Sequence, residues 1–135
     1  MSGQDGPSSL VGMSFAKLDG TNYRVWKMRM TDCLQRDGLW NLVIGREDIA
    51  EKPDKDTETD SKIYEKKYKR WERQDLRMQK AMRTLRMAMV EAISIRYHEA
   101  EWYTASDIWD DVEKSYRIAT SYDHQQKSAF DPYTS

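Results

Sequence analysis

Apolar residues recur every three or four positions through much of the chain, a spacing that indicates helices. The clearest case follows a turn at Gly20, where Thr21 or Asn22 is expected to cap a helix through its side-chain oxygen. Five residues then share one helical face: Tyr23, Trp26, Met30, Cys33 and Leu34. Glycine adopts the left-handed conformation without strain, so Gly38 is a natural stop. The pattern predicts a helix that ends at Asp37 or Gly38.

A short apolar cluster over residues 39–43 predicts one or two further helical turns, packed back onto the first helix. Gly45 is expected to end this segment. Residues 46–58 then combine Pro53 with many charged side chains, a composition typical of an exposed linker.

No proline or glycine interrupts residues 58–95, and the apolar spacing predicts one long helix that starts from a capping box at Thr57. Such a helix would be roughly 57 Å long. A globule of this size has a radius of gyration of only about 14 Å. The helix must therefore protrude or break. We expect residues 58–70 to project or fray, and the half after Trp71 to be buried.

A connection at residues 96–103 precedes a second capping box at Thr104. The following apolar residues again have helical spacing: Ile108, Trp109, Val112 and Tyr116. Residues 1–14 are rich in Gly and Ser and predict a disordered leader, and residues 118–135 a polar tail. The fold prediction is an all-α bundle of about four to five helices over residues 15–117, with disordered termini.

Residues able to do chemistry are sparse. Cys33 lies on the apolar face of its helix, which favours a buried and inert thiol. His98 and His124 are far apart and lack neighbouring ligands at metal-binding spacing. No phosphate-binding glycine loop, nucleophile elbow or HExxH motif is present. We predict no catalytic residue, no metal, no cofactor and no small-molecule substrate, and hence a protein that is not an enzyme.

Charge is strongly segregated although the net charge is only −1. Residues 47–60 hold seven acidic and two basic side chains, residues 62–86 ten basic and three acidic, and residues 98–113 six acidic ones with no Lys or Arg. The basic run offers candidate nucleic-acid contacts: Lys62, Lys66, Lys67, Lys69, Arg70 and Arg73. Its aromatic residues share one helical face, which favours packing over base stacking. A solvated or acid-paired helix face is the alternative interpretation.

No apolar run approaches the roughly 18–20 residues that span a bilayer, and the N-terminus has no apolar signal core. We therefore expect no membrane partner. The expected compartment is the cytoplasm, with the nucleus as the alternative.

Taken in order, these residues resemble a known family. The pattern F-x-x-L-x-G-x-N-Y-x-x-W-x-x-x-M-x-x-x-L is similar to the N-terminal, capsid-like part of Gag from copia-type LTR retrotransposons. Its matching residues are Phe15, Leu18, Gly20, Asn22, Tyr23, Trp26, Met30 and Leu34. Further matches follow at Leu39, Trp40, Val43, Gly45, Trp71, Asp75, Ala81, Thr104, Ala105, Ile108, Trp109, Val112 and Tyr116.

The resemblance implies a structural domain that associates with itself or with related Gag chains into a particle around RNA. In this family a CCHC zinc knuckle usually binds the RNA, and a single cysteine rules that knuckle out here. RNA binding is therefore expected to be weak. After Tyr116 the sequence departs from the family, where a further apolar helix would follow. We interpret the chain as a truncated or domesticated remnant of such a Gag, with a gene model cut at a false boundary as the alternative.

Overall fold

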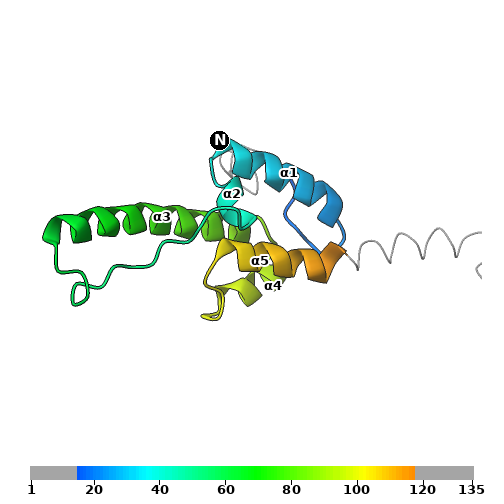
Figure 1. The fold of residues 1–135 in the computed structure, drawn as a ribbon. Coiled ribbons are helices and arrows are strands. Elements are labelled where there is room, and N and C mark those ends of the chain that lie inside the picture. Colours follow the sequence, from blue (N-terminus) through cyan, green and yellow to red (C-terminus); the bar gives the residue numbers. More distant parts are fainter. Residues whose placement is uncertain (1–14, 118–135) are drawn as a thin grey trace, which may run out of the picture.

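The computed structural model describes residues 15–117, and this part of the chain is all-α, as predicted. The predicted leader and polar tail lie outside the described residues. The α-helices are α1 (Tyr23–Arg36), α2 (Trp40–Val43), α3 (Ser61–Met87), α4 (Glu91–Ser94) and α5 (Ala105–Val112). A 3₁₀ turn, η2 (Ile95–His98), follows α4, and a π-helical turn, η3 (Glu113–Arg117), follows α5. Figure 1 shows the other helices gathered around one end of α3, while its N-terminal half projects.

The turn before α1 is fixed by Asn22, but not in the predicted way. Asn22 occupies the N-cap position, yet its side chain makes no capping hydrogen bond. Instead its Oδ1 accepts from the Asp19 amide at 3.0 Å and its Nδ2 donates to the Lys17 carbonyl at 2.9 Å. The Asn22 side chain thus holds the preceding loop against the helix start. At the other end α1 finishes at Arg36, and Gly38 has the expected positive φ of 73°.

The core lies between α1, α2, α5 and the C-terminal half of α3. Trp26 is at its centre, with its ring centroid 5.8 Å from that of Trp109. The ring of Trp40 meets Trp109 edge-on at 5.6 Å. Trp26 is only 2% exposed, and its Nε1 donates to the Ala88 carbonyl at 2.8 Å. The core therefore joins α1 to the segment that follows α3, more than sixty residues along the chain.

The long predicted helix breaks at Met87 rather than continuing to residue 95. Leu18 pairs with the backbone just beyond the break: its amide donates to Ala88 O at 2.8 Å, and its carbonyl accepts from Val90 N at 2.9 Å. A continuous helix would need the same groups for its own hydrogen bonds. The N-terminal segment therefore competes with the helix and ends it, and α4 restarts at Glu91.

The start of α3 also differs from the prediction. Asp60, not Thr57, is the N-cap, and its Oδ1 accepts from the amides of Lys62 and Ile63 at 2.9 and 3.3 Å. Thr57 instead donates its amide to Asp54 O in the preceding turn. With 27 residues, α3 spans about 40 Å, so its N-terminal half projects, as the length argument predicted. No helix in residues 15–117 combines the length and the apolar character needed to cross a membrane.

Candidate interaction surface

Most residues of the quoted motif lie in the core and form no binding site. The buried ones are Leu18, Tyr23, Trp26, Met30, Leu34, Leu39, Ile108 and Trp109. Phe15, Trp40 and Tyr116 are partly buried and pack against them. Gly20 has φ +98°, a conformation that L side chains rarely adopt. The motif therefore describes how the domain packs, and interaction surfaces must be sought elsewhere.

Trp71 does not belong to this core. It is only half-buried, and the buried residues of α3 begin at Met78, about two turns after Trp71. Its ring lies 5.5 Å from that of Tyr68, and the Nζ of Lys52 lies 5.1 Å from its centroid. Trp71 thus packs against the segment predicted to be an exposed linker, residues 46–58.

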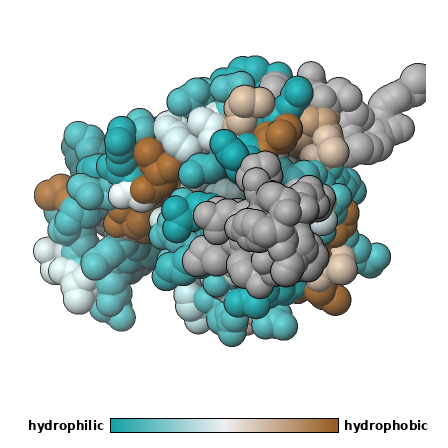
Figure 2. Space-filling model, turned by 90° about the vertical axis from the view of Figure 1, so that its right-hand side faces the viewer, coloured by the Kyte–Doolittle hydropathy of each residue, from teal (hydrophilic) through white to brown (hydrophobic). Residues whose placement is uncertain are grey.

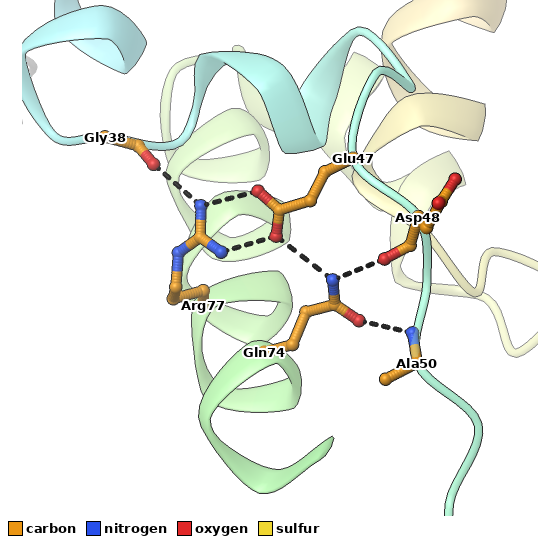
Figure 3. A network of polar contacts seen from close by, with 6 residues as sticks. All are labelled: Gly38, Glu47, Asp48, Ala50, Gln74 and Arg77. Carbon is orange, nitrogen blue, oxygen red and sulfur yellow. Dashed lines mark hydrogen bonds and ion pairs between the residues drawn. The ribbon is translucent and has the colours of Figure 1, made fainter. Parts of the chain in front are cut away.

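Residues 46–60, which include that segment, are here named the strap, because they are tied to α3 by polar contacts (Figure 3). Arg77 binds both carboxylate oxygens of Glu47 and donates to the Gly38 carbonyl at 2.8 Å. Gln74 donates to Asp48 O at 2.7 Å and accepts from the Ala50 amide at 2.7 Å. The strap backbone therefore finds in α3 the hydrogen-bond partners that a free linker would find in water.

The contacts continue towards the projecting end of α3. Lys67 Nζ pairs with Glu58 Oε2 at 2.9 Å, and Lys55 Nζ lies 5.9 Å from the ring centroid of Tyr64. Residues 46–58, predicted to be an exposed linker, are largely exposed and are also attached to α3. Charge composition indicated the exposure. It could not indicate that Glu47 meets Arg77, thirty residues away.

The Glu47 contact yields a pH prediction. Hydrogen bonds from Arg77 first, and then from Gln74, lower the pKa of Glu47 below its ordinary value. A lowered folded-state pKa stabilises the fold above the unfolded-state pKa, and this contribution is lost as the pH falls through the folded-state pKa. Because both side chains are partly exposed, Glu47→Gln should cost only about 0.5–1.5 kcal/mol at pH 7.

Urea unfolding of wild type and Glu47→Gln between pH 7 and pH 3 measures this effect. The difference should shrink below the ordinary glutamate pKa of about 4.3. Glu51→Gln is the matched control, since Glu51 is an exposed strap residue with no ion pair within residues 15–117. Equal stability of the two variants at pH 7 would contradict the proposed role of Glu47.

The structure divides the six predicted nucleic-acid contacts into two groups. Lys67 pairs with the strap, and Arg70 lines a hollow between the strap and α3. The other four lie along the opposite, solvent-exposed face of α3, at spacings of four, three and four residues. These are Lys62, Lys66, Lys69 and Arg73, here named the basic stripe. Basic and aromatic residues alternate in the sequence of α3. In the structure, however, the basic stripe and the aromatic side chains lie on different faces of the helix.

A second charged surface, of opposite sign, lies at α5. A shallow hollow of about 400 Å³ is lined by Glu101, Trp102, Asp107, Asp110, Asp111 and Lys114, and is here named the acidic hollow. Asp111 is already engaged, because it accepts from Tyr97 OH at 2.7 Å and pairs with Arg96 at 3.3 Å. Burial and this hydrogen bond raise the pKa of Tyr97. Sequence reasoning did not select these residues, although the acidic run over residues 98–113 was the available signal.

Metal-binding clusters and reactive thiols, which the sequence does not predict, are described here for residues 15–117. There, no three His, Cys, Asp or Glu side chains are placed to hold a metal ion. Cys33 is buried, and burial raises the pKa of its thiol, which disfavours the reactive thiolate. Among the exposed apolar residues, Val25 and Met28 are neighbours on α1, whereas Leu76 lies on α3. Figure 2 shows separate small apolar groups among hydrophilic ones.

Comparison with known proteins gives one match. A family profile described as a domain of unknown function (DUF4219) matches residues 18–44, the segment that runs from the Leu18 bridge through α1 and α2. No curated protein and no solved structure matches the chain. The matched segment contains the turn, the Trp26 face of α1 and the α2 cluster, so the similarity covers the packing centre of the fold.

Proposed function

We propose that this chain is a non-enzymatic structural protein, with a Gag or capsid-like domain of copia-type retrotransposon origin that acts by self-association. The observation that carries the proposal is the DUF4219 match over residues 18–44, which falls on the stretch that resembles copia-type Gag. The resemblance continues in α5 through Ile108 and Trp109, which pack on the same core.

The division between buried aromatic residues and exposed charged surfaces supports this proposal. Nearly all the aromatic side chains of the motif pack in or against the core, and Tyr23, Trp26 and Trp109 form one cluster there. The exposed features are a projecting helix and two surfaces of opposite charge. Such an arrangement suits a protein that works by contacting other copies, and it requires no substrate or cofactor.

Self-association is measured by sedimentation velocity over a wide range of protein concentration and salt. We expect the average mass to rise with concentration. A protein that stays monomeric at the highest attainable concentration would contradict the proposed function while leaving the fold unaffected.

A nucleic-acid-binding module is the second candidate, and the exposed basic stripe is the observation that favours it. The aromatic residues of α3 do not add to it, because Tyr64 and Trp71 face the strap and cannot stack on bases. Binding by the stripe alone would be electrostatic and would weaken steeply with salt.

A further inference from the structure

We propose that the basic stripe of one copy docks into the acidic hollow of a second copy, so that copies join head to tail. This inference rests on the proposed self-association and names the two surfaces that carry it. Each copy presents both surfaces, on different parts of the chain. A contact between unlike surfaces leaves one of each free, so it can repeat into rings or filaments.

The basic stripe is free to receive a partner. All four of its side chains are exposed, and none makes an ion pair with any other described residue. The strap lies against the other side of α3, where Lys52 covers Trp71 and Glu58 holds Lys67. The stripe runs for about 17 Å along the projecting half of the helix. Its four like charges are therefore held in line at the most accessible part of the domain.

The acidic hollow is the better of two acidic candidates. Glu101, Asp107 and Asp110 form no ion pair within residues 15–117, and only Lys114 opposes them in the lining. The strap is also acidic, but the hollow that it forms with α3 is lined by both signs of charge: Asp48, Glu51, Asp54 and Glu58 share it with Lys52, Lys67 and Arg70. Of the two hollows, the acidic hollow therefore has the larger excess of negative charge, which makes it the complement of the stripe.

The same observations favour a protein partner over RNA. The aromatic side chains nearest the stripe lie on the strap-covered face, so the stripe offers charge without a stacking platform. The exposed acidic hollow on the same chain would repel a polyanion. A carboxylate-lined surface of another copy has neither disadvantage.

Paired charge reversals test the contact. One variant carries Lys66→Glu with Arg73→Glu, and the other carries Asp107→Lys with Asp110→Lys. Either alone replaces attraction with repulsion, and we expect self-association at least about tenfold weaker. In an equimolar mixture the acidic stripe of the first variant faces the basic hollow of the second, and the unmodified surfaces also match. The mixture should therefore recover association in sedimentation velocity.

The control variant is Arg24→Glu with Arg29→Glu, which makes the same change in net charge on exposed positions of α1. It should associate like wild type. Circular dichroism and melting establish that all the variants are folded, as expected for exposed positions. Recovery in the mixture cannot come from misfolded chains, so it separates the contact from a loss of structure.

Each remaining outcome has a definite meaning. A wild type that never associates overturns both this contact and the proposed function. Association that neither reversal weakens overturns the contact and leaves the proposed function standing. If the Lys66/Arg73 reversal abolishes binding of an oligouridine strand but leaves association unchanged, the stripe is an RNA surface and the contact is overturned.

Discussion

Trp26→Ala is expected to lower the free energy of unfolding by about 3–5 kcal/mol, the largest effect of any single substitution considered for this chain. The indole is 2% exposed and packs against Tyr23 and Trp109. Its removal opens a cavity at the centre of the core. It also deprives the Ala88 carbonyl of one of its two donors, at the point where α3 ends.

Thermal melting followed by circular dichroism measures this effect, and a fall in Tm of roughly 10–25 °C corresponds to it. Val25→Ala is the matched control, because Val25 is the neighbouring residue on α1 and is 55% exposed. It should melt within a few degrees of wild type. A folded Trp26→Ala variant with unchanged melting would show that this tryptophan is not the packing centre.

Leu85→Ala should cost about 2–5 kcal/mol, whereas Leu76→Ala should change stability by less than about 0.5 kcal/mol. Both leucines belong to α3, but Leu85 is completely buried and Leu76 is 65% exposed. The pair therefore tests which face of α3 packs against the core. Only its C-terminal half contributes to the core, and the projecting half is held by the strap.

Urea unfolding of the two variants at neutral pH provides the comparison. Similar losses in both would mean that the face of α3 that carries Leu76 is also packed, in conflict with its exposure. Because the substitutions are chemically identical, their difference reports burial alone and cannot come from helix propensity.

The proposed function explains why α3 has a packed C-terminal half and a projecting N-terminal half. A domain that assembles needs a stable body and a surface that reaches beyond it. The core around Trp26 supplies the body, and the strap supports the projecting part of α3 through its contacts with Lys67 and Trp71. The basic stripe is thereby presented on a supported helix.

The sequence by itself determined the helical class, the apolar face of α1 and the left-handed stop at Gly38. These follow from local rules: helical spacing places Tyr23, Trp26 and Met30 on one side, and only glycine adopts the stop without strain. The capping box at Thr104 is of the same kind, and its Oγ1 accepts from the Asp107 amide at 3.1 Å. The separation of charge along the chain was also visible.

Only the tertiary structure decided where α3 ends, what the strap does and which charges remain free. The break at Met87 depends on Leu18, which lies seventy residues earlier and takes the backbone hydrogen bonds at Ala88 and Val90. The attachment of the strap depends on Glu47 meeting Arg77. Periodicity within one segment carries no information about such partners, because a hydrogen bond or ion pair between distant residues exists only once the chain has folded.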